Sequence, residues 1–169
     1  MVDVDKCCIT RFPAEVLEAK ARPVEAVDEN IAKLADVMID IMIEEKGIGL
    51  AGPQAGVGLR IFVISVDGTR EGAKVFINPV IEVSGDVESI EEGCLSLPNI
   101  YGKVKRHTVC KITATGLDGE EFSEVGEGLY ARAMQHEYDH LEGTMIKDHF
   151  NRLQMMGARK QLKKLLDEA

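Results

Sequence analysis

The segment Gln135–His140 contains the pattern H-E-x-x-H, which constrains the local fold more than any other stretch of the chain. His136 and His140 are four residues apart, so an α-helix places both imidazoles on one face, one turn apart. Two imidazoles at that spacing can bind one metal ion. Glu137 then stands beside the first ligand, where a carboxylate can take a proton from a metal-bound water. The pattern therefore predicts a metal-binding helix over about 127–142. The alternative is an ordinary surface helix, but half of the chain's four histidines fall here around a glutamate.

A third ligand is not visible downstream of these histidines. Catalytic zinc-type sites usually have three protein ligands and one open position for water. The longer pattern H-E-x-x-H-x-x-G-x-x-H is followed only as far as Gly143, because Ile146 stands where its third histidine belongs. The two later glutamates, Glu142 and Glu168, lie too close to the pair and at the chain end, and His149 lies beyond the expected spacing. We therefore expect the third ligand upstream.

Cys94 is the upstream candidate. It follows a glycine within 91–98, a segment that ends in proline, which predicts an exposed loop or the end of a strand. A free thiol is more often a buried structural residue, and that reading would be preferred for Cys94 taken alone. The need for one more soft ligand favours the metal-binding role.

Composition limits the classes of protein to consider. The 169 residues suffice for one domain with its own core, so we expect a single domain over 1–169. The sequence has no run of about 18 apolar residues, so no membrane span is expected. The N-terminus has no basic segment followed by an apolar one, so no secretory signal is expected. The four cysteines form no C-x-x-C pattern, which fits a reducing cytoplasm. A net charge of −9 argues against a general binder of DNA or RNA.

Hydrophobic periodicity predicts the remaining elements. Apolar residues at steps of three and four predict an amphipathic helix over 25–46, after an irregular N-terminal arm over 1–23. A last helix, over 151–167, would be carried by Leu153, Met156, Leu162, Leu165 and Leu166. Strands are predicted over 60–66, 74–81 and 83–90, and a hairpin over 109–116 and 120–125.

A glycine-rich segment, 47–54 (G-I-G-L-A-G-P-Q), follows the first helix. Its small residues would let the backbone come close to another group. A phosphate-binding loop is excluded, because no Lys-Ser or Lys-Thr follows and the glycines come after a helix. A plain tight turn remains the alternative.

Three patterns now stand in one order: 47–54, then E-G-C-L-S over 92–96, then Q-H-E-Y-D-H over 135–140. Together they resemble the peptide deformylases, which carry G-x-G-x-A-A-x-Q, E-G-C-L-S and Q-H-E-x-D-H. The chain departs from that pattern at Gly52, which replaces the second alanine, and over 11–15, a loose version of the family's entry segment. The resemblance implies an α+β fold with mixed or antiparallel sheets around the metal-binding helix, an N-terminal amphipathic helix and a C-terminal helix.

The implied activity is hydrolysis of the N-formyl group of formylmethionine on newly synthesised polypeptides, with release of formate, in the bacterial cytosol. The implied metal ligands are Cys94, His136 and His140. The metal is usually Fe(II) in this family, and zinc, nickel or cobalt can replace it. Glu137 would activate a metal-bound water as general base, and the Gln54 amide and Leu95 N–H would stabilise the oxyanion.

The resemblance also places the substrate. Ile48, Gly49 and Gly93 would pair with its backbone as an added strand. The methionine pocket would be formed by Ile48, Leu129 and Ala133. Arg132 would stand at the rim and keep its charge in water. Glu92 and Asp139 are the carboxylates nearest in sequence to the implied ligands, so we expect at least one of them to hydrogen-bond a metal-bound histidine, with Arg106 as a cationic partner. The alternative for Asp139 is a solvated helix residue.

Two other functions and one partner stay open. A peptidase of the H-E-x-x-H type lacks its downstream ligand here, and a non-catalytic metal-binding module would need neither Glu137 nor Gln54. Residues 149–169 carry a net charge of +3, which leaves −12 on residues 1–148. The basic C-terminal helix is therefore either a solvated outer face or, as the resemblance allows, a surface that docks on the ribosome.

Overall fold

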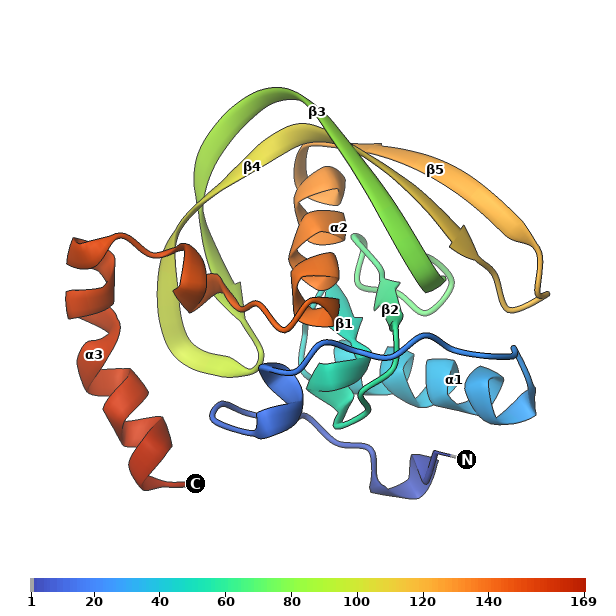
Figure 1. Ribbon diagram of the computed structural model, residues 1–169, viewed down its shortest axis with the longest axis horizontal. Helices are drawn as coiled ribbons and strands as arrows, with labels where there is room; N and C mark the ends of the chain where they lie inside the picture. Colours follow the sequence, from blue (N-terminus) through green and yellow to red (C-terminus); the bar gives the residue numbers. More distant parts are fainter. Residues whose placement is uncertain (1) are drawn as a thin grey trace.

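A computed structural model describes residues 2–169, so Met1, the first residue of the expected arm, lies outside the described residues. The chain forms a five-stranded antiparallel sheet and three α-helices, with 3₁₀ turns between them (Figure 1). The strands are paired in sequence order: β1 (Gly49–Ala51), β2 (Ile61–Ile64), β3 (Lys74–Cys94), β4 (Leu97–Thr115) and β5 (Glu121–Glu127). The helices are α1 (Glu29–Glu44), α2 (Gly128–Leu141) and α3 (Arg152–Asp167). The α+β expectation is confirmed, and every strand pair of the sheet is antiparallel.

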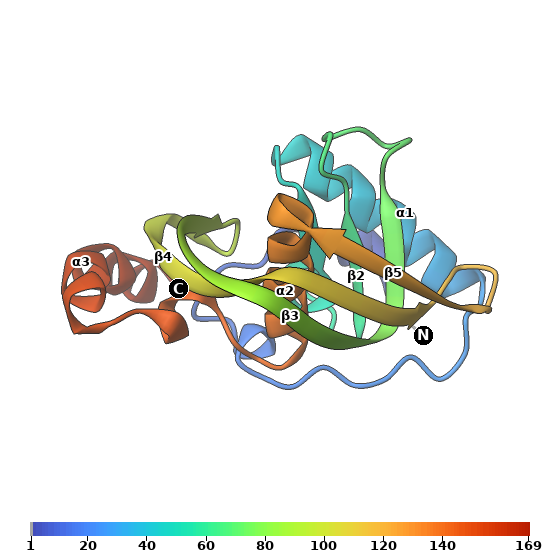
Figure 2. The same cartoon turned by 90° about the horizontal axis from the view of Figure 1, so that it is seen from above.

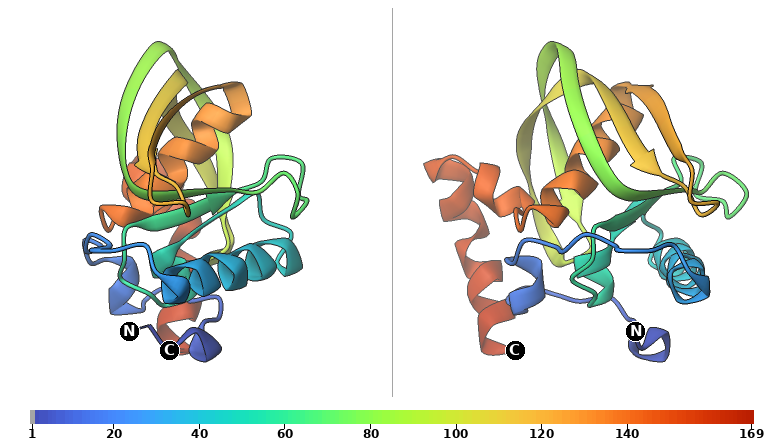
Figure 3. Two further views of the ribbon diagram at one scale, coloured as in Figure 1. Left: turned by 90° about the vertical axis from the view of Figure 1, so that its right-hand side faces the viewer. Right: turned by 45° about the vertical axis from the view of Figure 1, so that its right-hand side comes forward.

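The long hairpin of β3 and β4 is the main difference from the expected strands. The two strands predicted over 74–81 and 83–90 are one strand, and the start of β4 was not predicted. Register shifts after Ile77, Ser84 and Gly93 bend the hairpin, as bulges do. The bent hairpin arches over α2 in Figure 1 and again in Figure 3. Residues 82–91 are almost all exposed, so they lack the apolar alternation that would have shown one continuous strand.

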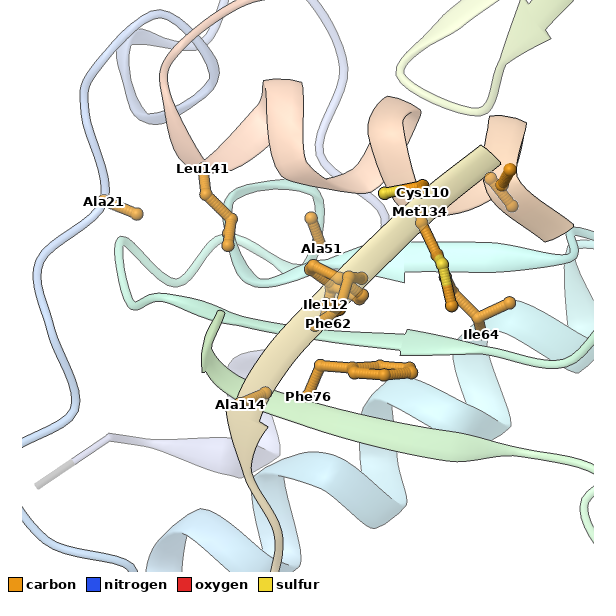
Figure 4. Packing of buried hydrophobic residues seen from close by; sticks show 12 residues of the cluster. Ala21, Ala51, Phe62, Ile64, Phe76, Cys110, Ile112, Ala114, Met134 and Leu141 are labelled. Atoms are coloured by element: carbon orange, nitrogen blue, oxygen red, sulfur yellow. The ribbon is translucent and has the colours of Figure 1, made fainter. Parts of the chain in front are cut away.

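Helix α2 passes through the middle of the molecule and is packed on the sheet. Its buried residues Ala131, Met134 and Leu141 meet side chains of β2, β3 and β4 (Figure 4). Phe62 and Phe76 stack at the centre of this cluster, with ring centroids 5.0 Å apart. This core fixes the helix that carries the two histidines.

Helix α1 covers the other side of β1 and β2. Asp28 caps its N-terminus by accepting a hydrogen bond from the Ile31 N–H at 2.9 Å, so the helix begins at Glu29 and not at the predicted residue 25. Its apolar face is buried through Leu34, Met38 and other residues of a second core cluster. Helix α1 packs against β1, and β1 in turn contacts α2, so α1 holds the glycine-rich segment against α2.

Helix α3 lies at the periphery, beside the tip of the β3–β4 hairpin (Figure 2). Leu162 and Leu165 are packed on the body of the protein as expected. Leu153, Met156 and Leu166 are exposed, so the prediction that they anchor the helix was wrong. Ala158 is buried in the same cluster, so the helix packs on the body along one edge, through Ala158, Leu162 and Leu165. Among residues 2–169, no helix is long and apolar enough to cross a membrane.

Candidate metal centre and cleft

The three predicted ligands meet at one point. Cys94 is the last residue of β3, where the hairpin turns back, and His136 and His140 face it from one side of α2. The candidate ligand atoms all lie within 4.8 Å of one another, and Cys94 Sγ is 3.3 Å from His140 Nε2. The structure therefore brings together residues 46 positions apart in the sequence. Cys94 stands at a strand end, as expected, and is half-buried.

Glu92 orients the first histidine. His136 Nδ1 donates to Glu92 Oε2 at 2.9 Å, because an ionised carboxylate can only accept. The Nε2 lone pair of His136 is then directed at the metal position. Glu92 is held in turn by Arg106, whose Nε and Nη2 donate to its two oxygens at 2.8 and 3.0 Å. Asp139 accepts from Arg106 Nη1 at 2.7 Å, so both predicted carboxylates belong to the network around the ligands.

The pKa values in this cluster reflect burial and pairing. Burial raises the pKa of Glu92, but hydrogen bonds from His136 and Arg106 outweigh it and hold the pKa far below its usual range. Burial also raises the pKa of Cys94, yet the charge of His140 and the contact with His136 hold it well below the ordinary value, which favours the thiolate. Glu137 behaves differently, because burial is its largest influence and raises the pKa to about 7. A carboxyl with a pKa near neutrality is suited to exchange protons.

The donor set fits a catalytic divalent metal. A thiolate and two imidazoles suit borderline and soft divalent ions, and three protein ligands leave one position open. Glu137 Oε2 is buried beside this triad and has no hydrogen-bond partner among the described residues. A buried carboxylate oxygen without a partner is costly unless a ligand or substrate meets it. A structural site would more often have a fourth protein ligand in this place.

Gln54 presents its amide group to the same point. Its Oε1 accepts from the Ala51 N–H at 2.9 Å, which fixes the orientation of the amide. Its Nε2 then lies 3.5 Å from Cys94 Sγ, so the donor end faces the metal position. Leu95, the residue after Cys94, also lines the cleft.

A cleft of about 570 Å³ opens beside the metal position. All of the predicted substrate-binding residues line it: Ile48, Gly49, Gly93, Leu129, Arg132 and Ala133. Arg132 does not hold its charge in water as predicted, because the residue is only 8% exposed. Its Nη1 donates to Glu92 Oε1 at 2.7 Å and to the Val104 carbonyl at 3.0 Å. Arg132 therefore stabilises the buried carboxylate of the network from the wall of the cleft.

The sequence did not indicate three further residues of the cleft. Ile90 and Tyr101, from the two strands of the long hairpin, and Arg11, from the N-terminal arm, also line it. The Tyr101 ring lies against Gly93, where an added Cβ would be 2.7 Å from it. No local pattern marks these positions, since the arch of the hairpin brings Ile90 and Tyr101 to the cleft and the course of the N-terminal arm brings Arg11 there.

Comparisons with known proteins agree with this geometry. Residues 7–156 match the polypeptide deformylase family. Peptide deformylase 1 of Clostridium perfringens is 48% identical over 137 residues, which cover 80% of this chain and 91% of the relative. The crystal structure of a peptide deformylase from Legionella pneumophila superposes with a TM-score of 0.88 at 40% identity, covering 92% of each chain. Peptide deformylase of Plasmodium falciparum gives a TM-score of 0.91 at 34% identity, covering 95% of each chain.

Proposed function

The chain belongs to the polypeptide deformylase family and removes the N-formyl group from nascent polypeptides, and we propose that the residues of the cleft share this reaction as follows. The observation that carries the proposal is the buried Glu137 carboxylate oxygen, which has no hydrogen-bond partner within residues 2–169 and lies beside a cluster of three candidate metal ligands. Cys94, His136 and His140 would hold a divalent ion. When bound, that ion supplies a Lewis acid that lowers the pKa of water and polarises the formyl oxygen.

Glu137 is the proton carrier in this proposal. Its carboxylate takes a proton from the attacking water and passes it to the amine that leaves the formyl carbon. Burial supports this assignment, since it raises the pKa of Glu137 to about 7 and keeps the two protonation states close in free energy. Oε2 is buried and hydrogen-bonds to no other described residue, so no protein group competes for the proton that it would carry.

Gln54 and Leu95 stabilise the negative charge that develops on the formyl oxygen. The Gln54 amide is fixed before substrate arrives, because the Ala51 N–H already holds its oxygen. Preorganised donors of this kind lower a barrier by about 3 to 4 kcal/mol each. The backbone N–H of Leu95 is the second proposed donor.

The substrate backbone would bind as an added strand. β1 is an edge strand, and β2 pairs with β3 only from Lys74 to Ile77. The remainder of β3, up to Gly93, therefore has one edge that no described strand covers. A peptide between Ile48 and Gly93 can pair with both edges, while Ile48, Leu129 and Ala133 contact the methionine side chain. Leu129 is largely exposed in the free enzyme, which leaves it apolar surface to bury on binding.

Fe(II) is the metal we propose in the cell, with zinc, nickel or cobalt as replacements in purified protein. A site with one thiolate and two imidazoles accepts all of these ions, so availability selects among them. The proposed compartment is the bacterial cytosol. All four cysteines are free thiols, which suits a reducing environment.

The ribosome is a further proposed partner, through α3. The basic residues of α3 are all exposed: Arg152, Arg159, Lys160, Lys163 and Lys164. With Leu153 and Met156 also exposed, the outer face combines cations with apolar side chains. Such a face can contact ribosomal RNA through phosphates, and its binding would weaken with salt. Removal of residues 151–169 should abolish co-sedimentation with ribosomes at low salt and spare turnover of short formyl peptides. Equal sedimentation of the shortened protein would refute the proposal.

The reaction itself is tested by formate release from a formyl-methionyl tripeptide, with metal analysis of protein purified without oxygen. We expect activity in the metal-loaded protein and none on unformylated internal peptide bonds. Glu137→Ala should keep the metal and lose about 10²- to 10⁴-fold in kcat, because the carboxylate is not a ligand. Loss of metal in this variant would instead show that Glu137 supports the ligands.

A further inference from the structure

His149 stands outside the cleft but is joined to it by hydrogen bonds. It ends the 3₁₀ turn Ile146–His149, just before α3. Its Nε2 lies 2.8 Å from Asp139 Oδ2. The carboxylate of Asp139 can only accept, so the histidine donates this hydrogen bond. The same oxygen accepts from Arg106 Nη1 at 2.7 Å, so Asp139 is held from two sides.

A continuous path leads from this contact to a metal ligand. Arg106 joins Asp139 to Glu92, and Glu92 accepts from His136 Nδ1 at 2.9 Å. The exposed fraction of the side chains falls along this path from His149 to Glu92. The side chain of His149 is 32% exposed and that of Asp139 is 25% exposed, whereas those of Arg106 and Glu92 are almost fully buried. The outermost contact is therefore the one that water can replace.

We propose that His149 is a positioning residue for the metal centre, acting through Asp139, Arg106 and Glu92 on the His136 ring. The inference rests on the proposed metal site of the function above. The donor of His149 keeps the Asp139 carboxylate turned inward. Asp139 then fixes the end of the Arg106 guanidinium that Glu92 does not hold, and the guanidinium plane sets the position of Glu92.

Hydrogen bonding, and not packing, is the contribution of His149. His149 is an exposed residue, and its side chain is 32% exposed. By contrast, the next residue, Phe150, packs against Gly102 and anchors the turn independently of the imidazole. Replacement of His149 therefore removes a donor from Asp139 without opening a cavity. Asp139, already one-quarter exposed, can then rotate toward water and leave Arg106 with a less fixed partner.

Replacement of His149 should weaken metal retention less than replacement of a residue that hydrogen-bonds His136 directly. Removal of a residue hydrogen-bonded to a metal-bound histidine typically costs about 10- to 100-fold in affinity. His149 is three contacts further out, so we expect metal loss from His149→Phe to be faster by about 3- to 10-fold, below that range. The kcat should fall by a similar factor with KM nearly unchanged, because no atom of His149 lines the cleft.

The test uses the full chain loaded with Co(II), whose visible absorption reports the geometry of the cysteine and histidine ligands. Rates of Co(II) transfer to a chelator, absorption spectra, kcat and KM are compared for wild type, His149→Phe, His149→Ala and His149→Arg. Arginine keeps a donor, and the partly exposed position has room for it, so His149→Arg should restore the wild-type rate and spectrum. The matched control is His107→Phe, a histidine whose ring, among residues 2–169, hydrogen-bonds to the Gly85 carbonyl alone.

Faster cobalt loss and a shifted spectrum in His149→Phe and His149→Ala, with recovery in His149→Arg, would support the proposal. It would be overturned by wild-type cobalt loss and spectra in both non-donor variants. Failure of His149→Arg to recover, or an equal effect of His107→Phe, would overturn it too. The cobalt measurements do not depend on turnover, so they separate this proposal from the proposed function. If wild type bound cobalt but did not release formate, only the function would fail.

Discussion

Gly49 leaves room for the Glu137 carboxylate, and this contact allows a quantitative prediction. A Cβ at Gly49 would lie 2.4 Å from Glu137 Oε1, 2.8 Å from its Cδ and 2.9 Å from its Cγ. Ordinary van der Waals contact begins at 3.4 Å. The carboxylate of a Gly49→Ala variant must therefore move by about 1 Å, because both β1 and α2 are held by the core. A misplacement of that size can lower kcat by about 10²-fold, equivalent to about 2.7 kcal/mol of barrier.

Steady-state formate release by Gly49→Ala, with its metal content measured in parallel, tests this prediction. We expect full metal occupancy, because the three atoms nearest to the new methyl group all belong to Glu137, which is not one of the proposed ligands. KM should change little, since alanine keeps the backbone groups that pair with substrate. Gly157→Ala is the matched control: nothing lies within 4 Å of its added Cβ, and it stands inside α3. That change should leave kcat unaltered and stabilise the helix by up to about 1 kcal/mol.

A second substitution shows whether crowding of the carboxylate is the cause. Glu137→Asp shortens the side chain by one methylene and should be costly alone. In the Gly49→Ala background it should cost much less, because the shorter side chain fits beside the methyl group. Wild-type kcat in Gly49→Ala, or strictly additive losses in the double variant, would refute the steric explanation.

Three further outcomes are expected. Glu92→Gln should weaken metal affinity by about 10- to 100-fold in a chelator competition. The reason is that glutamine lacks the charge that pairs with Arg106 and orients His136. Unchanged affinity would contradict this. Peroxide should inactivate the iron-loaded enzyme faster than the nickel- or zinc-loaded enzyme, because the proposed ligand Cys94 would bind the metal as a thiolate. Equal rates would count against oxidation at the metal and its thiolate. Phe62→Ala should lower the free energy of unfolding by about 3 to 5 kcal/mol in urea titration, and a loss below 1 kcal/mol would show that the core refills the cavity beside Phe76.

The site was more predictable than the sheet, because its signals are local. His136 and His140 are four residues apart, so one helical turn determines how their side chains are placed. Cys94 was proposed because a catalytic metal site usually has three protein ligands and no third one was visible downstream. The sheet depends on pairing between distant residues. The arch of β3 over α2 arises from register shifts near Ile77 and Ser84, where Asn78 and Gly85 adopt positive φ angles of 49° and 76°. An exposed stretch with such irregularities carries no periodic signal, so the strand was predicted in pieces.

The partner of Arg132 could not be predicted either. An arginine beside apolar cleft residues indicates a rim position when only its neighbours in sequence are considered. In the structure its guanidinium meets Glu92, 40 residues away, at 2.7 Å. The same limitation affected α3, where periodicity identified the helix but not which of its apolar residues face the body. Such contacts depend on the closed hairpin and are not properties of a single segment.

The network around Glu92 is better explained by orientation than by stability. It contains two carboxylates, Glu92 and Asp139, and two guanidinium groups, Arg106 and Arg132, so its formal charges balance. Removing such charges from water costs several kcal/mol each, and apolar residues of similar volume often give an equally stable fold. Hydrophobic replacement would, however, leave His136 Nδ1 without an acceptor and the ring free to rotate. The cost of these largely buried charges is therefore offset by their role, because they fix one imidazole of the proposed metal site, beside which Glu137 would meet the substrate.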